Sequence, residues 1–140
     1  MLKCFFSYFG AKYRSGRMCL KPLHPILIEP FAGAAGYSVR YCHLRVHLYD
    51  IDPIIYGIWN YLIRAKESEI LSLPEAVVDT QLLAVPQEAK WLIGFWINPG
   101  SSVPKRTPTS WCGLAKDLGC HPRSAMVTDG SQYSTYIEAE

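Results

Sequence analysis

The stretch that decides the fold is Ile26-Leu27-Ile28-Glu29-Pro30-Phe31-Ala32-Gly33-Ala34-Ala35-Gly36. Its first three residues form a short aliphatic run between Pro25 and Pro30, which predicts a buried strand. The small residues after Phe31 predict a tight turn. Because such a turn has few bulky side chains, its backbone can pass close to a nucleotide-like ligand at the carboxyl edge of a sheet.

A second strand and a helix follow this turn. Residues 45–49 alternate in polarity, with Val46 and Leu48 on one face, and predict a strand. Asp52 suits the N-cap of the next helix, and Pro53 suits its first turn. The helix has an apolar stripe at helical spacing that predicts burial in the core, namely Ile54, Ile55, Ile58, Trp59 and Leu62. With a short helix at 37–42, the order of elements predicts the start of a parallel α/β sheet.

The rest of the chain divides into helices and a tail. Residues 74–85 predict a helix, and Pro86 begins another that covers 87–97 and ends at Asn98-Pro99-Gly100. From Ser101 onward Ser, Thr, Pro and Gly are frequent and no periodicity is apparent. We therefore expect a domain at 1–100 and an irregular or disordered tail at 101–140, with one short helix there marked by Trp111, Leu114 and Leu118.

Composition favours one globular domain of an intracellular protein. Of the 140 residues, 49% are apolar and 19% are charged. No apolar run reaches the roughly 18 residues that a membrane helix needs, and we find no signal peptide. The five cysteines are odd in number and form no Cys-x-x-Cys pair, which favours reduced thiols in the cytoplasm. His43 and His47 flank the entry to a predicted strand and need not face the same way, so we expect no metal site.

The first 22 residues are basic and contain no acidic residue, although the net charge of the chain is only +2. Aromatic residues are interleaved with the basic ones, a pattern that suits a loop near phosphate groups or bases. Composition alone favours a solvated basic terminus. The candidate DNA-binding residues in this segment are Lys12, Arg14 and Arg17.

Gly33 and Asp50 form the candidate ligand site. Asp50 ends the second predicted strand, seventeen residues after Gly33, where its carboxylate can accept hydrogen bonds from two ribose hydroxyls. Ile51, the next residue, can pack against an adenine face. Many α/β folds have such a turn and acid, so this pair alone leaves a plain strand-to-helix turn with a capping Asp equally open.

Three segments together resemble the motifs of the Dam-like site-specific DNA adenine-N6 methyltransferases of phage and prophage type. Residues 29–34, Glu-Pro-Phe-Ala-Gly-Ala, are similar to that family's cofactor-binding motif, and residues 48–53, Leu-Tyr-Asp-Ile-Asp-Pro, to its second motif. Residues 6–14, Phe-Ser-Tyr-Phe-Gly-Ala-Lys-Tyr-Arg, resemble its N-terminal aromatic-x-Gly-Gly-Lys motif. The resemblance covers roughly 5–71, with a weaker similarity at 91–98.

The resemblance implies a partial doubly wound, Rossmann-like methyltransferase sheet that binds S-adenosylmethionine and acts on adenine N6 in double-stranded DNA. It implies that the N-terminal loop closes over the cofactor, that two residues of the turn shape the pocket floor, and that an acid holds the ribose. With Ile51, the predicted cofactor residues are Tyr8, Gly10, Lys12, Phe31, Gly33, Asp50 and Ile51. The chain departs from the family's pattern at Ala11 and Ala35. We expect an added methyl group at either position to narrow the pocket.

The family's catalytic Asp-Pro-Pro-Tyr motif has no counterpart in this chain, which contains no Pro-Pro pair. That motif aligns the exocyclic amine of a flipped-out base with the cofactor methyl. The nearest mimic, Asn98-Pro99-Gly100-Ser101, suits a helix stop, so we assign no catalytic residue. We expect an inactive fragment from a truncated or frameshifted gene, which self-associates through an uncovered sheet edge. A partner chain that supplies the missing half is the alternative.

Two other functions stay open on the sequence. An NAD-type nucleotide-binding α/β protein would use the same turn and Asp50, although the segment from Tyr8 to Lys12 argues against it. A small non-enzymatic DNA-binding protein would use the basic N-terminus, and its DNA affinity would fall steeply with salt.

Overall fold

The computed structural model describes residues 4–12, 15–74, 76–109 and 137–139. Arg14 and the helix expected around Trp111, Leu114 and Leu118 lie outside the described residues. Of the tail predicted at 101–140, residues 101–109 contain neither helix nor strand, and residues 137–139 form a strand.

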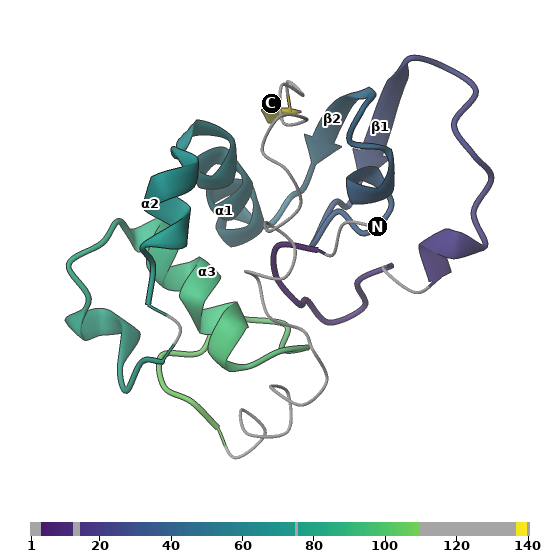
Figure 1. The fold of residues 1–140 in the computed structure, drawn as a ribbon. Coiled ribbons are helices and arrows are strands. Elements are labelled where there is room, and N and C mark those ends of the chain that lie inside the picture. Colours follow the sequence, from purple (N-terminus) through teal and green to yellow (C-terminus); the bar gives the residue numbers. More distant parts are fainter. Residues whose placement is uncertain (1–3, 13–14, 75, 110–136, 140) are drawn as a thin grey trace.

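The sheet is parallel, as the sequence predicted. β1 (Ile26–Pro30) pairs with β2 (Arg45–Tyr49) in a register that places Leu27 opposite Val46 and Glu29 opposite Leu48. β3 (Ile137–Ala139) pairs with the other edge of β2, also in parallel, so the strand order is β1-β2-β3 (Figure 1). The described residues therefore form a mixed α/β structure, and they do not show a doubly wound sheet.

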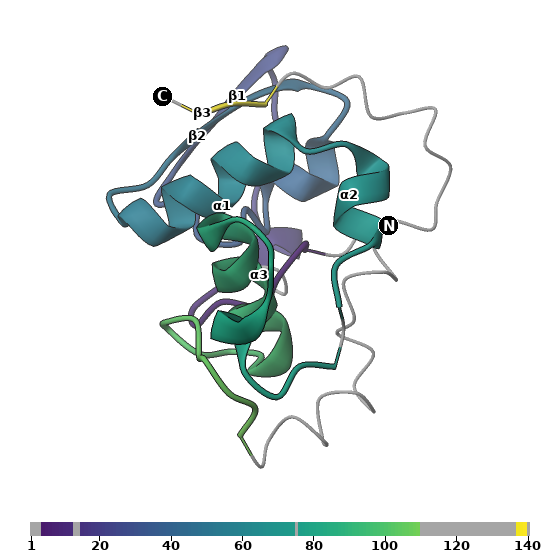
Figure 2. The ribbon, with the colours of Figure 1, turned by 90° about the vertical axis from the view of Figure 1, so that its left-hand side faces the viewer.

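Helices cover one face of this sheet. α1 (Pro53–Arg64) lies against the sheet, and α3 (Gln87–Ile97) packs behind α1, so that sheet, α1 and α3 form successive layers (Figure 2). The strands bury alternate residues toward α1, including Leu27, Val46 and Leu48. The core therefore lies between the sheet and the two helices.

α1 begins and packs as its sequence predicted. The Asp52 carboxylate caps the helix by accepting a hydrogen bond from the backbone N–H of Ile54 at 2.9 Å, and Pro53 occupies the first turn. The apolar stripe of α1 faces the core, with Ile55, Ile58 and Trp59 buried and with Ile54 and Leu62 partly buried.

Two glycines allow other parts of the chain to pack closely at α3. At Gly57 of α1 an added Cβ would lie 2.9 Å from the ring of Trp91, so the small residue lets this ring pack on α1. At Gly94 an added Cβ would lie 2.7 Å from the carbonyl oxygen of Lys105. The loop after α3 therefore folds back directly onto the helix.

The helix predicted at 74–85 is wrong. α2 (Glu67–Leu71) ends before this segment, and residues 76–85 contain only the 3-10 turn η3 (Thr80–Leu82). The Asp79 carboxylate accepts from the N–H of Gln81, and the Thr80 N–H donates to the carbonyl of Arg106 at 2.9 Å. Because these bonds go to a side chain and to a distant loop, they replace the i→i−4 bonds of a helix.

The helix predicted at 37–42 is a 3-10 helix, η2 (Ser38–Tyr41), and another, η1 (Ser15–Arg17), follows the N-terminal loop. α3 ends at Ile97, which agrees with the helix stop predicted at Asn98.

The other face of the sheet carries exposed apolar side chains. Ile28 is 63% exposed, and Ile26 and Tyr49 are exposed beside it. Self-association of the chain stays a prediction. Within the described ranges, no helix is long and apolar enough to cross a bilayer.

Candidate functional site

A cavity of about 260 Å³ opens where the two long strands end and the N-terminal loop crosses them. Three segments line it: the loop at 8–12, the end of β1 with the following turn, and the end of β2 with the start of α1. The lining residues are Tyr8, Phe9, Gly10, Ala11, Lys12, Glu29, Phe31, Ala32, Gly33, Asp50, Ile51 and Asp52. The cavity is thus at the carboxyl edge of a parallel sheet, where α/β folds bind ligands.

Gly33 and Asp50, which the sequence predicted to meet, are in direct contact. Oδ2 of Asp50 accepts a hydrogen bond from the backbone N–H of Gly33 at 2.8 Å. Oδ1 of the same carboxylate accepts from the N–H of Asp52 at 2.9 Å. An ionised carboxylate offers about four acceptor positions, so Asp50 keeps capacity for two further donors on its cavity side.

The turn at Gly33 is held from both sides. Gly33 has a φ of +49°, a conformation that suits glycine. Its carbonyl oxygen accepts a hydrogen bond from Nε1 of the buried Trp59 at 2.7 Å, while its N–H faces Asp50. An added Cβ at Gly33 would lie 3.1 Å from Cδ1 of Tyr8, so the Tyr8 ring packs directly against Gly33. Glycine is therefore favoured at position 33 both by the positive φ and by the close approach of the Tyr8 ring.

Two other turn residues with side chains share this left-handed conformation. Phe31 has a φ of +57° and Ala35 has a φ of +48°. A residue with a Cβ pays roughly 1–2 kcal/mol for this conformation. The turn is therefore strained at the cavity, a feature often found at ligand sites. Ala35 is buried in the core and does not line the cavity, so the narrowing of the pocket expected at this position is not found, whereas Ala11 does line the cavity.

The N-terminal loop is fastened over the cavity by contacts with α3 and with the loop after it. The Phe9 N–H donates to the carbonyl of Ser101 at 3.1 Å, and the Trp96 indole donates to the carbonyl of Phe5 at 2.8 Å. The ring of Tyr8 packs edge-on against Phe95 at a centroid distance of 5.7 Å. These contacts fix the N-terminal loop to α3 and to the loop that follows it.

Tyr8 stays a neutral phenol at physiological pH. Its burial, and then the nearby Asp52 and Asp50 carboxylates, raise the pKa of its hydroxyl above the ordinary value. The phenol can therefore donate a hydrogen bond beside the two carboxylates.

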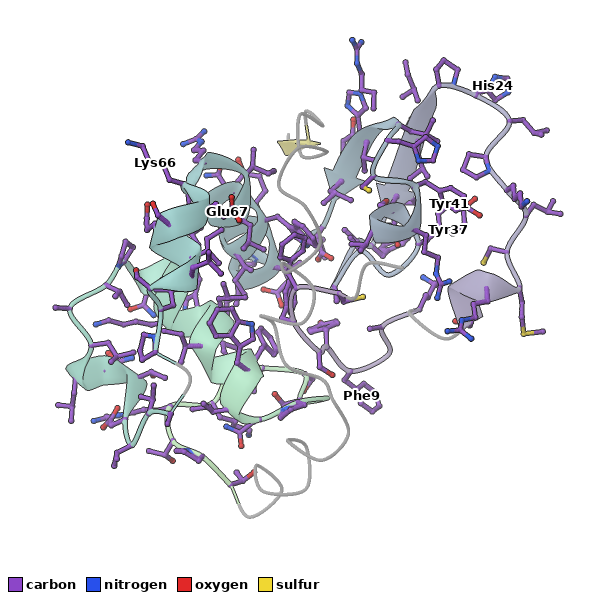
Figure 3. All side chains as sticks on the ribbon, viewed as in Figure 1. Phe9, His24, Tyr37, Tyr41, Lys66 and Glu67 are labelled. Carbon is purple, nitrogen blue, oxygen red and sulfur yellow. The ribbon has the colours of Figure 1, made fainter. Side chains whose placement is uncertain are left out.

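Three large apolar side chains stand at the mouth of the cavity and face solvent. Ile51 is 92% exposed, Phe31 is 77% exposed and Phe9 is 72% exposed. Figure 3 shows Phe9 projecting from the N-terminal loop away from the body of the protein. Exposed apolar groups that rim a cavity suit contact with a flat, apolar ligand surface such as a base.

The structure brings all seven predicted cofactor residues to this one cavity, namely Tyr8, Gly10, Lys12, Phe31, Gly33, Asp50 and Ile51. Of the predicted DNA-binding residues, Lys12 lines the cavity, whereas Arg17 is exposed at the end of η1 and does not line it. No metal cluster is found among the His, Cys, Asp and Glu residues that the structure describes, and these include His43 and His47.

Sequence reasoning missed the role of Glu29. This carboxylate is buried at the end of β1, lines the cavity, and accepts hydrogen bonds from the N–H and hydroxyl of Ser38. It therefore ties the turn to η2. The signal was present in the strand, where Glu29 occupies the inward phase of the alternation, two residues after Leu27.

Asn98 has a structural role. Its buried side chain donates to the carbonyl of Thr107 at 3.0 Å and accepts from the N–H of Thr109 at 2.9 Å. It therefore pins the loop after α3, in agreement with the predicted helix stop.

Comparison with protein-family models, with curated proteins and with solved structures finds no match to this chain. The functional interpretation therefore rests on the three sequence motifs and on the geometry of the cavity.

Proposed function

We propose that the cavity binds S-adenosylmethionine, and that this chain is the cofactor-binding part of a DNA adenine-N6 methyltransferase of the Dam-like type. The observation that carries the proposal is the position of Asp50. Its carboxylate lies at the cavity wall, held by the Gly33 and Asp52 amides. Such a carboxylate at the end of the second strand is suited to accept hydrogen bonds from two ribose hydroxyls.

The volume of the cavity suits the nucleoside part of this cofactor. At about 260 Å³ it lies just below the roughly 300–1,000 Å³ typical of small-molecule sites. We therefore assign the adenosyl group to the cavity, with its base against the exposed Ile51 and its ribose on Asp50. The methionine part then extends under the N-terminal loop toward Tyr8.

The residues of this chain act by binding and orientation. When bound, S-adenosylmethionine supplies an electrophilic methyl group on a sulfonium centre. Asp50 fixes the sugar, Gly33 keeps the floor of the cavity clear of side chains, and Lys12 offers a positive charge at the rim. Glu29 adds a buried carboxylate that holds the turn through Ser38.

Methyl transfer needs a further set of groups. An adenine amine must be aligned with the methyl group, and the family's Asp-Pro-Pro-Tyr motif does this work by orientation. The sequence contains no such motif. We therefore propose cofactor binding for this chain, and no turnover by this chain alone. On this proposal, β1 and β2 are two strands of a doubly wound methyltransferase sheet, and double-stranded DNA is the partner.

Calorimetry on the full chain tests the proposal. We expect S-adenosylmethionine and its demethylated product to bind, and NAD to bind much more weakly. Asp50→Asn removes the negative charge that accepts the ribose hydroxyls. A hydrogen bond to a charged group contributes about 1.5–3 kcal/mol, so the variant should lose at least about tenfold in affinity.

Asp52→Asn is the matched control. It makes the same change two residues away in the same cavity wall, and Asn retains the ability to cap α1. We expect its cofactor affinity to stay near that of the wild type. Equal affinity for Asp50→Asn and wild type, with both proteins folded by circular dichroism, would remove Asp50 from the site and the proposal with it. Tighter binding of NAD than of S-adenosylmethionine would favour the nicotinamide alternative.

A further inference from the structure

A second concave surface lies beside the cofactor cavity, and its charge is positive. It is a groove of about 220 Å³, here called the basic groove, formed by the start of α1, the segment 80–81, one face of α3 and the loop 103–106. Its cationic lining residues are Lys90, Lys105 and Arg106, and none of the carboxylates that the structure describes lines it.

The walls of the basic groove are held in place. Arg106 pairs with Asp79 in a bidentate arrangement, with Nε and Nη2 donating to the carboxylate at 2.6–2.8 Å. The Arg106 carbonyl accepts from the Thr80 N–H at 2.9 Å, and the adjoining backbone lies directly on Gly94 of α3. The groove is therefore a preformed surface whose cations need no large rearrangement to meet a ligand.

The three cations of the basic groove differ in how far they are already paired. Asp79 occupies the guanidinium of Arg106, so this pair is close to neutral and serves mainly to fix the loop. The Lys90 ammonium donates to the carbonyl of Gln81 at 3.4 Å, which leaves further donors, and Lys105 is exposed. The Asp79 carboxylate also interacts electrostatically with Lys90. Three cations against this one carboxylate leave the groove with two net positive charges, which favour an anionic ligand.

The basic groove and the cofactor cavity are neighbours. Asp52 lines the cavity and Ile54 lines the groove, so the first turn of α1 separates the two. The loop that leads to Lys105 is also bonded to the rim of the cavity, through the Phe9 N–H and the Ser101 carbonyl. The two concave surfaces are therefore joined through the first turn of α1 and through this hydrogen bond.

We propose that the basic groove binds the phosphodiester backbone of a nucleic-acid strand, with Lys90 and Lys105 as the phosphate ligands. The identity of the strand as substrate DNA rests on the function proposed above, whereas the groove itself does not. A flat membrane surface does not enter a concave surface, whereas the phosphate groups of a flexible strand can. Lysine ammonium groups also bind phosphate as point charges and do not read sequence.

Salt-dependent binding of short fluorescent oligonucleotides to the full chain tests this proposal. For each phosphate that a lysine neutralises, the slope of log affinity against log salt concentration changes by about one unit. Lys90→Gln combined with Lys105→Gln should therefore reduce the slope by about two units and weaken binding at low salt by at least about tenfold. Both substitutions leave the Asp79–Arg106 pair and the backbone contact at Gly94 in place.

Lys66→Gln is the matched control. Lys66 precedes α2 and does not line the basic groove. Lys66→Gln lowers the net charge by one unit, and each of the two groove substitutions lowers it by the same amount. We expect its salt slope to stay close to that of the wild type.

Several outcomes would overturn the proposal. These are no binding of DNA by the wild-type chain, a double variant with an unchanged salt slope, equal losses in the double variant and in Lys66→Gln, and competition by inorganic phosphate at the concentration of oligonucleotide phosphate. The last would show a small-anion site. Tighter binding to anionic phospholipid vesicles than to DNA would also overturn it, in favour of a membrane surface. S-adenosylmethionine affinity is measured on the same variants and should not change, so failure of the groove and failure of the cofactor site are distinguished.

Discussion

Replacing Gly33 by alanine tests how the turn, the Tyr8 ring and the cavity depend on one another. Gly33 has a φ of +49°, and an added Cβ lies 3.1 Å from Cδ1 of Tyr8. The Tyr8 ring is itself packed edge-on against Phe95. The new methyl group therefore meets unfavourable backbone torsion and a ring with little room to move.

Both effects can be given a size. The left-handed conformation costs a residue with a Cβ roughly 1–2 kcal/mol, and the lower entropy of the unfolded alanine chain offsets about 0.4–1 kcal/mol of this. The difference is about 1 kcal/mol. Displacement of the packed Tyr8 ring adds roughly another 1 kcal/mol, at the low end for overpacking. We expect Gly33→Ala to lower the free energy of unfolding by about 2 kcal/mol, which is a fall in Tm of about 8 °C for a chain of this size.

Two other glycines provide the comparison. Gly10 and Gly100 have φ values of +78° and +79°, and an added Cβ meets nothing within 4 Å at either position. Alanine there carries the torsional cost alone, so we expect a loss of about 1 kcal/mol. Thermal denaturation followed by circular dichroism measures all three variants. A Tm for Gly33→Ala no lower than that for Gly100→Ala would refute the packing of Tyr8 on the turn.

Three further changes test other parts of the structure. Gly94→Ala places a Cβ 2.7 Å from the carbonyl oxygen of Lys105, so we expect a loss of about 1–3 kcal/mol in urea denaturation; an unchanged midpoint would show that this loop does not lie on α3. Hydrogen bonds from Arg106 lower the pKa of Asp79 below its ordinary value of 3.8, so the ionised group stabilises the fold above that pH and the stabilisation is lost as pH falls through the lower folded pKa. Asp79→Asn should therefore flatten the acid limb of a stability–pH curve measured by circular dichroism, and an acid limb like that of wild type would contradict this. Asp52→Ala removes the acceptor that caps α1 and should cost about 1 kcal/mol, whereas Asp52→Asn should retain most of it; equal melting temperatures would show that the cap contributes little.

Prediction from sequence succeeded where the partners of a residue lie within its own element. The strand at 45–49 and the helix at 87–97 match the structure at both ends, because strand alternation, a proline before the first helical turn and the Asn-Pro-Gly sequence after the last one are local signals. The approach of Gly33 to Asp50 was predicted as well, since parallel strands bring their carboxyl ends to one edge.

It failed where distant partners decide the structure. Residues 74–85 have helix-compatible composition, but the backbone of Thr80 bonds to Arg106 and the Asp79 carboxylate pairs with the same residue. No pattern within this segment indicates that Asp79 pairs with Arg106, 27 positions away. The basic groove was missed for the same reason, since Lys90 and Lys105 come together only because Gly94 allows the loop to lie on α3.

The hydrogen bond from the Phe9 amide to the Ser101 carbonyl joins the rim of the cofactor cavity to the loop that leads to the basic groove. The Phe9 amide proton is therefore sensitive to changes in both regions. In an NMR experiment its exchange with deuterated solvent would slow if either region became more rigid, so a single backbone resonance would report occupancy at both places and any communication between them.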